Sequence, residues 1–278
     1  MRKRVVRFSV KKMQLRHSRQ SLSQSSSDGT VIQLWLLGPM QMYVVAGEVP
    51  LAARKSRALL VYLATKRGIP VPRQTLIGLL WGDRSEDQAR ASLRQTLSAL
   101  RKDLGEDAAK RLTTVGDSVT LAVEGVWVDA DELEQASDKS SAESLESAAA
   151  LFRGDLVEGL AVNEPAFDHW LAAERERIRA QMLRVLMELV SRLEQENRIE
   201  DAITHCAKAL ALDPFQEKMH RLLIGFYMKQ GRHDAALAQF EQCRRTLADQ
   251  LGVAPEQETL DLVAEVKVRR RQISGKPV

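Results

Sequence analysis

Short apolar runs separated by turn residues dominate the chain between residues 31 and 51. The runs are interrupted by Gly38-Pro39 and by Ala46-Gly47-Glu48, and both combinations favour turns. Apolar, partly β-branched runs between such signals are typical of strands. The runs cover residues 31–37, 40–45 and 49–51. The pattern therefore predicts a small antiparallel sheet.

Three segments with helical periodicity follow. We predict helices at about residues 56–66, around residues 76–80 and at about residues 89–104. A glycine follows each of them, as is common at helix ends. Two strand-like runs at 112–115 and 119–123 then flank Gly116-Asp117, which favours a hairpin turn. Strands, three helices and a hairpin in this order predict a winged helix-turn-helix domain at residues 30–128.

The second half of the chain is predicted to be all α-helical. Residues 131–147 are polar and serine-rich and are interpreted as a joint, and residues 167–195 form a long amphipathic pattern. The stretch from Asn197 matches the stretch from Gly231, an offset of 34 residues with alanine at both Ala202 and Ala236. That period is typical of tetratricopeptide (TPR) repeats. Two repeats need covering helices, which 167–195 and about 256–270 can supply.

The expected fold class is therefore mainly α. An N-terminal winged helix-turn-helix, α+β with a small antiparallel sheet and a wing, is followed by a TPR-like helical-repeat domain at residues 129–272. We expect residues 1–29 to be a disordered basic tail and residues 273–278 to be a second disordered tail.

Composition excludes several classes of protein. Hydrophobic residues make up 44% and charged residues 28%, which is typical of soluble globular proteins. The longest apolar stretch, near residues 34–45, contains Gly38, Pro39 and Gln41 and is too short for a membrane span. Two cysteines cannot form a disulfide framework, and no Cys/His spacing fits zinc. We therefore do not expect a secreted disulfide scaffold, a membrane protein or a zinc-binding protein.

Enzymatic activity is not expected either. Four of the five histidines lie in the helical half, and none is placed beside a convincing nucleophile or carboxylate pair. No Gly-x-x-x-x-Gly-Lys-Ser/Thr segment is present to bind phosphates, so no cofactor is expected. Cys206, which matches Phe240 in the repeat, is interpreted as a buried structural thiol.

Charge is distributed unevenly along the chain. Residues 1–27 hold eight lysines and arginines and no acid, residues 28–128 carry a net charge of +3, and residues 129–278 carry −7. A polyanion is therefore expected to meet the first half. The acid-free start also resembles a mitochondrial transit peptide, which is a minor alternative.

The predicted third helix has one apolar face and one cationic face. Leu93, Leu97, Leu100 and Leu104 share the apolar side. Arginine and lysine can bond guanine or phosphate, and glutamine can pair with adenine, so the opposite face is a candidate major-groove reader. The alternative is an ordinary solvated helix surface. The cationic face comprises Arg90, Arg94, Gln95, Ser98, Arg101 and Lys102.

Most of the chain resembles a known family. Across residues 31–268 it is similar to the SARP (AfsR/DnrI/RedD-like) bacterial transcriptional activators, which join an OmpR-type winged helix to a bacterial transcriptional activation domain. The first domain matches at residues 37–40 (LGPM), 54–60 (RKSRALL), 79–83 (LLWGD) and 89–105. The second matches at residues 151–156 (LFRGDL), 170–171 (WL), 174–177 (ERER), 209–214 (ALALDP) and 247–255 (LADQLGVAP).

The resemblance implies sequence-specific binding of double-stranded DNA near promoters and recruitment of RNA polymerase. It places Arg94, Gln95, Ser98, Arg101 and Lys102 in the major groove, and Arg54, Arg57 and Arg73 near phosphates. It also makes the loop 82–88 a polymerase contact, through Asp83, Arg84, Glu86 and Asp87. The implied wing comprises Thr114, Gly116, Asp117 and Ser118.

Location, assembly and regulation are implied less directly. A DNA-binding regulator is expected in the cytoplasm, associated with the nucleoid. The family suggests a homodimer or tandem binding on direct repeats. The alternative function is that of a TPR-type protein-protein adaptor without sequence-specific DNA binding.

Two departures from the family pattern concern DNA contacts. The wing turn carries Asp117 where relatives often present a cation, so the basic tail is a hypothetical replacement in the minor groove. Before the second helix the chain has Pro72, interpreted as a first-turn residue, where the family often has a serine or threonine cap.

Overall fold

The computed structural model describes residues 29, 31–136 and 141–274, which form two compact units. The winged-helix unit comprises the described residues up to Asp129 together with Leu156–Ala172. The helical-repeat unit comprises Ala130–Asp155 and the described residues from Ala173 onward. The predicted basic tail lies outside the described residues except for Gly29. The second predicted tail begins too early, because helix continues to residue 274.

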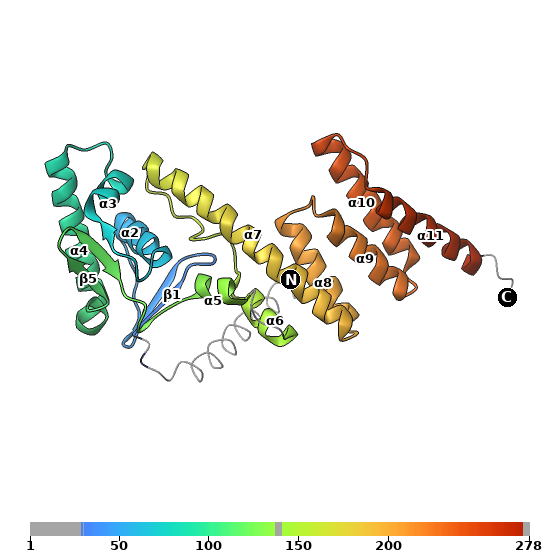
Figure 1. Cartoon of the computed structure of the whole chain (residues 1–278), viewed down its shortest axis with the longest axis horizontal. Coiled ribbons are helices and arrows are strands. Elements are labelled where there is room, and N and C mark those ends of the chain that lie inside the picture. Colours follow the sequence, from blue (N-terminus) through green and yellow to red (C-terminus); the bar gives the residue numbers. More distant parts are fainter. Residues whose placement is uncertain (1–28, 30, 137–140, 275–278) are drawn as a thin grey trace, which may run out of the picture. The chain divides into compact units, whose positions relative to one another are not determined.

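The winged-helix unit begins with a four-stranded sheet in the order β3-β2-β1-β7 (Figure 1). β1 and β2 pair antiparallel as predicted, with Ile32 opposite Val44. β7 pairs parallel to β1, so the expectation of a purely antiparallel sheet is wrong for this strand. A parallel partner needs a crossover connection, which the three helices and the wing provide. The strands are β1 (Ile32–Trp35), β2 (Gln41–Val44), β3 (Gly47–Glu48) and β7 (Val126–Val128).

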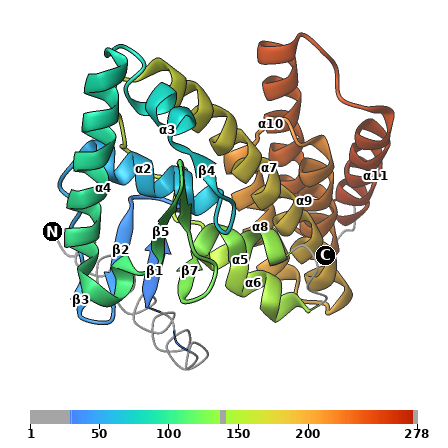
Figure 2. The same ribbon diagram turned by 60° about the vertical axis from the view of Figure 1, so that its left-hand side comes forward.

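Three helices lie between β3 and the wing hairpin in the sequence, in the predicted order (Figure 2). The leucines of the third helix are at most 2% exposed, which confirms its apolar face. This helix starts three residues earlier than predicted. The reason is that the carboxylates of Glu86 and Asp87 in its first turn stabilise the positive end of the helix dipole. Gly105, with φ 77°, breaks its helical path. The helices are α2 (Arg54–Thr65), α3 (Arg73–Leu80) and α4 (Glu86–Ala109).

The wing is a hairpin of β5 (Leu112–Val115) and β6 (Ser118–Leu121), extended by the short strand β4 (Val71–Pro72). Gly116 adopts φ 56° at the first central position of the turn, where type II′ hairpins favour glycine. Pro72 is the residue before α3 and pairs with Ser118 of β6, so it is not the first-turn residue that we predicted.

A segment from the second half of the sequence, Leu156–Ala172, packs in the winged-helix unit; we call it the return segment. The amide of Val157 donates to the carbonyl of Leu36 (2.7 Å), and Phe167 is fully buried. The buried carboxylate of Asp129 accepts hydrogen bonds from the amides of Leu36 (2.7 Å) and Leu37 (3.0 Å). Residues distant in sequence thus provide hydrogen-bond partners for the backbone just after β1. The winged-helix unit therefore includes residues beyond the predicted boundary at residue 128.

The return segment is also held by its own side chains. Lys55 forms an ion pair with the buried Glu164 and donates to the carbonyl of Leu80 (2.5 Å) at the end of α3. The Trp170 ring lies 4.9 Å from that of Tyr62 in α2, centroid to centroid. The segment therefore contacts α2 and the end of α3, the elements that support α4.

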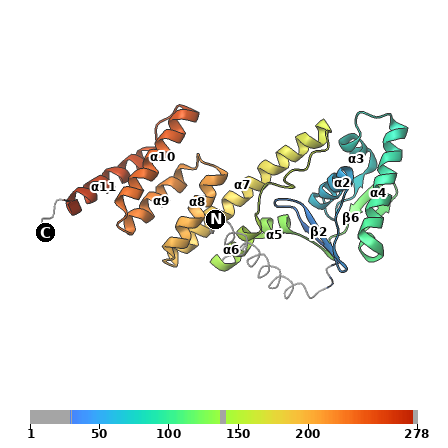
Figure 3. The same cartoon turned by 180° about the vertical axis from the view of Figure 1, so that it is seen from behind.

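The helical-repeat unit consists of consecutive helices (Figure 3). Most of the predicted joint at 131–147 is helical, and only residues 137–140 within it lie outside the described residues. The helices are α5 (Asp129–Ala136), α6 (Ala142–Leu151), α7 (Pro165–Gln195, from Ala173 onward), α8 (Ile199–Leu212), α9 (Glu217–Lys229), α10 (His233–Leu251) and α11 (Gln257–Ser274).

The backbone conformation and its hydrogen bonds repeat with the predicted period of 34 residues. Asn197 (φ 58°) and Gly231 (φ 72°) adopt the same left-handed conformation ahead of α8 and α10. The next amide in each repeat, Arg198 or Arg232, donates to a carbonyl five residues earlier at 2.8 Å. Ala202 and Ala236 are fully buried. Cys206 is buried as predicted, and burial raises the pKa of its thiol to about 12.

Buried histidines predict a pH dependence for this unit. Burial lowers the pKa of His220 below its ordinary 6.5, an effect partly offset by the carbonyl of Pro214 and by Glu217. Its ring bonds Pro214 through Nε2 (3.1 Å) and Gln239 through Nδ1 (2.6 Å), so Nδ1 accepts and a proton there would break the second bond. Burial also lowers the pKa of His205.

The unfolded chain therefore binds protons that the folded unit excludes, so the free energy of unfolding is highest above about pH 6.5 and decreases as the pH falls. Urea unfolding followed by far-ultraviolet circular dichroism at about pH 7.5 and about pH 5.5 measures the difference. His220→Gln is expected to reduce this difference. Equal stability of the wild type at both pH values would contradict the prediction.

Candidate nucleic-acid interface

α4 presents a polar, cationic face opposite its buried leucines. Because leucines recur every three or four residues, the intervening side chains share the outer side of the helix. Five of the six predicted reading residues are exposed: Arg90, Arg94, Gln95, Ser98 and Lys102. No acidic residue lies among them, and the first to follow is Asp103.

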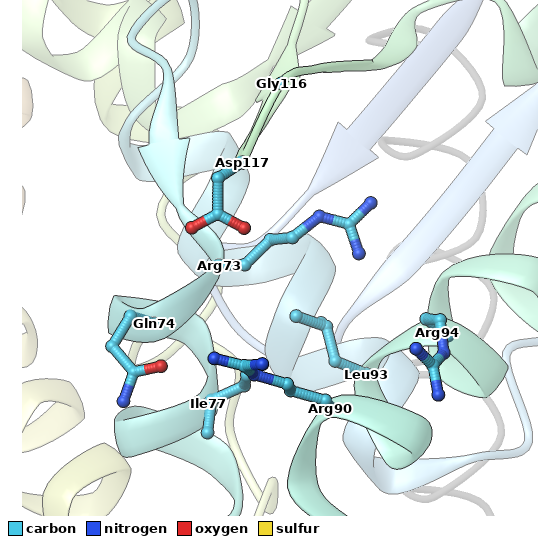
Figure 4. Close-up of a pocket in the computed structure, with 8 residues that line it drawn as sticks. All are labelled: Arg73, Gln74, Ile77, Arg90, Leu93, Arg94, Gly116 and Asp117. Carbon is cyan, nitrogen blue, oxygen red and sulfur yellow. The ribbon is translucent and has the colours of Figure 1, made fainter. Parts of the chain in front are cut away.

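A hollow of about 450 Å³ lies beside this face. Its walls come from the first two turns of α3, the first half of α4 and the turn of the wing (Figure 4). The amide of Arg73 donates to the carbonyl of Asp117 (2.8 Å), which ties the start of α3 to the wing turn. The lining residues are Arg73, Gln74, Ile77, Arg90, Leu93, Arg94, Gly116 and Asp117.

The three guanidinium groups of the hollow differ in their partners. Arg90 forms an ion pair with Glu86 one turn earlier, and both side chains are more than half exposed. Such an exposed ion pair contributes little to stability and leaves the guanidinium of Arg90 available to a ligand. Arg73 and Arg94 have no ion-pair or hydrogen-bond partner for their side chains among the described residues. Three cations around one carboxylate, Asp117, give the hollow a positive potential suited to an anionic ligand.

Arg101 occupies a different position from the rest of the set. It is half-buried, and its Nη2 donates to Thr114 Oγ1 (2.7 Å) and to the carbonyl of Leu112 (3.2 Å). Both acceptors belong to β5. The side chain thus joins α4 to the wing, whereas sequence reasoning placed it among the base-reading residues. Periodicity puts it on the outer face of the helix, but only the tertiary structure shows the strand beside it.

Loss of the Arg101 bridge is expected to weaken the wing rather than the reading face. Arg101→Ala removes a hydrogen bond from a charged donor, and we expect a loss of about 1–2 kcal/mol in the free energy of unfolding. Urea unfolding followed by tryptophan fluorescence measures it. Lys102→Ala is the matched control, because Lys102 is exposed and has no side-chain partner among the described residues. Equal stability of the two variants would contradict the assigned role.

The predicted phosphate contacts are only partly brought together. Arg73 lines the hollow. Arg54 is the exposed first residue of α2, and Arg57 is half-buried with Nη2 3.5 Å from the carbonyl of Ala52. Neither lines the hollow, so their role stays a prediction. Gln74 also lines the hollow but was not among the predicted site residues. Its position next to Arg73 in the first turn of α3 could have indicated it.

The predicted polymerase-contact residues are all exposed. Asp83 and Arg84 lie in the loop between α3 and α4, whereas Glu86 and Asp87 belong to the first turn of α4. Arg84 Nη1 donates to Ser92 Oγ (2.9 Å), which ties the loop to α4. Of the predicted wing residues, Thr114 bonds Arg101, and Gly116 and Asp117 form the turn before Ser118.

Among the described residues no group of three or more His, Cys, Asp or Glu side chains is arranged to hold a metal ion. Nor does any described helix combine the length and the apolar character needed to cross a membrane.

The fold and this site define a winged-helix protein with an attached helical-repeat unit. Comparison with known proteins gives the family. Residues 123–267 match the family described as "Bacterial transcriptional activator domain", and residues 47–117 match "Transcriptional regulatory protein, C terminal". The chain belongs to the first of these families and, with both domains, to the SARP group of bacterial transcriptional regulators.

Proteins similar to this chain are named as regulatory proteins. Regulatory protein AfsR of Streptomyces coelicolor is 30% identical over 81% of this chain and 23% of its own length. Transcriptional regulatory protein EmbR of Mycobacterium tuberculosis is 27% identical over 87% of this chain and 64% of its own length. The chain thus spans about a quarter of AfsR and less than two thirds of EmbR.

A solved structure supports the fold. EmbR of Mycobacterium tuberculosis, in complex with a low-affinity phosphopeptide, superposes with a TM-score of 0.66 at 24% identity. The match covers 89% of this chain and 66% of the EmbR chain. It confirms the expected order of a winged helix followed by a helical domain.

Proposed function

We propose that this chain is a sequence-specific DNA-binding transcriptional regulator without enzymatic activity. In this proposal α4 lies in the major groove, where Arg94, Gln95 and Ser98 reach base edges. Arg73 and Gln74 contact the sugar-phosphate backbone beside the hollow, which positions the domain without reading sequence. The observation that carries the proposal is the positive hollow beside the exposed face of α4. Arg73 and Arg94 both line it, and their side chains have no partner among the described residues.

The remaining parts of the proposal follow from the family. The exposed loop residue Asp83, with the neighbouring charged side chains, is proposed to contact RNA polymerase and make the protein an activator. Promoter binding would place the protein in the cytoplasm at the nucleoid. Binding to direct repeats in tandem is part of the same proposal.

Unbiased selection of bound duplexes from a random DNA pool, with the purified full chain, tests the proposal. We expect enrichment of a defined element, and tandem copies of it if protomers bind side by side. The logarithm of affinity for that element should decrease linearly with the logarithm of salt concentration, with a slope of about −0.9 for each phosphate neutralised. No enrichment at low salt would reject DNA reading and favour the protein-protein adaptor.

A further inference from the structure

The wing hairpin carries one charged side chain, and that charge is negative. Between residues 112 and 121 the only charged residue is Asp117, which is exposed at the turn. Its backbone is held in place, because the amide of Arg73 donates to its carbonyl at 2.8 Å. Its carboxylate lines the hollow with three guanidinium groups but has no ion-pair or hydrogen-bond partner among the described residues. The wing therefore presents an available acceptor beside the proposed DNA surface.

The position of the wing turn relative to α4 indicates which groove of the DNA it meets. Figure 4 shows the wing turn and α4 on opposite sides of the hollow. In the proposed complex α4 lies in the major groove, and one strand of the sugar-phosphate backbone lies along the hollow against Arg73 and Gln74. The groove on the other side of that strand is the minor groove. Asp117 then lies at the edge of the minor groove.

A carboxylate at this place discriminates between base pairs. Phosphates repel it, and the repulsion is strongest in A-tracts, whose narrow minor groove has an enhanced negative potential. In this groove A·T and T·A pairs present only acceptors, adenine N3 and thymine O2. G·C and C·G pairs add one donor, the N2 amino group of guanine. Guanine is thus the only base that can donate a hydrogen bond to Asp117 there.

We propose that Asp117 is a specificity-determining residue whose carboxylate accepts a hydrogen bond from the N2 amino group of a guanine in the minor groove. The same negative charge disfavours A·T-rich sequence at that position. The DNA element therefore contains a G·C pair beside the positions that α4 reads. This inference rests on the proposed function and extends it from the major groove to the minor groove.

Replacing guanine by inosine tests the contact with the purified full chain. Inosine pairs with cytosine and keeps the major-groove atoms of guanine, but it lacks the N2 amino group. Each guanine of the selected element is replaced singly, and affinity is measured by fluorescence anisotropy. We expect the affinity of the wild type to fall about tenfold at one guanine beside the α4 positions. Asp117→Ala should bind the guanine and inosine duplexes equally, and should also tolerate A·T at that position.

A matched control removes the same charge elsewhere in the winged-helix unit. Glu124 is exposed and does not line the hollow, so Glu124→Ala should keep the full preference for guanine. If the wild type selects no element, the proposed function and this inference both fail. If an element is bound but no inosine replacement weakens binding, this inference alone is overturned. A preference for guanine over inosine that persists in Asp117→Ala would overturn it equally.

Discussion

Replacing Phe167 by alanine is expected to destabilise the winged-helix unit by about 3–5 kcal/mol, the usual cost of removing a fully buried phenylalanine. Phe167 is 0% exposed, and its ring lies 5.2 Å from that of Trp170, centroid to centroid. It belongs to the return segment, so the variant asks whether the unit depends on residues beyond position 128. A cavity at this place would also loosen the support of α2.

The chain offers a way to observe this unit separately. All four tryptophans (Trp35, Trp81, Trp127 and Trp170) lie in the winged-helix unit, so tryptophan fluorescence reports its unfolding. Far-ultraviolet circular dichroism is dominated by the helices of the other unit. In urea, Phe167→Ala should shift the fluorescence midpoint strongly.

A matched control removes a phenylalanine from the other unit. Phe226 of α9 is 1% exposed, and Phe226→Ala should shift the dichroism midpoint more than the fluorescence midpoint. If Phe167→Ala left the fluorescence midpoint at the wild-type value, the return segment would have no part in the stability of the winged-helix unit.

Arg94→Ala is expected to reduce affinity for the selected DNA element by about 1–3 kcal/mol, or about 5- to 150-fold, if Arg94 reads a base. Its guanidinium is exposed on α4, lines the hollow and has no partner among the described residues, so the substitution removes no internal contact. Fluorescence anisotropy with the selected element and with unrelated DNA of equal length measures the loss.

The pattern of loss distinguishes the two kinds of contact. A base-reading arginine changes the ratio between selected and unrelated DNA, whereas a phosphate contact lowers both affinities and reduces the salt slope by about 1. Arg244→Ala is the control, because Arg244 is 51% exposed on α10 and pairs with Glu241 in the helical-repeat unit. Unchanged binding by Arg94→Ala would remove α4 from the proposed interface.

Much of the fold follows from local sequence. The spacing of the leucines from Leu93 to Leu104 specifies an amphipathic helix and which side is buried, because helical geometry relates residues three and four apart. Gly116 marks the wing turn, because glycine adopts positive φ without strain. The 34-residue period specifies repeated helices before any contact is known.

Contacts between distant segments could not be predicted in this way. The parallel pairing of β7 with β1, the capture of the β1 end by Asp129 and the packing of Phe167 join residues far apart in sequence. A periodic pattern states that a side is buried but not what covers it. The misplacement of the domain boundary has this cause.

The same distinction between local sequence and distant contacts applies to the candidate site. By itself the sequence determined that one side of α4 would be cationic and exposed, since charge and period belong to the chain. Only the tertiary structure decided that Arg73 and Gln74 join Arg94 around one hollow, and that Arg101 turns to β5 instead. The physical reason is that a hydrogen bond or a cavity depends on positions set by several elements at once, which no single stretch of sequence specifies.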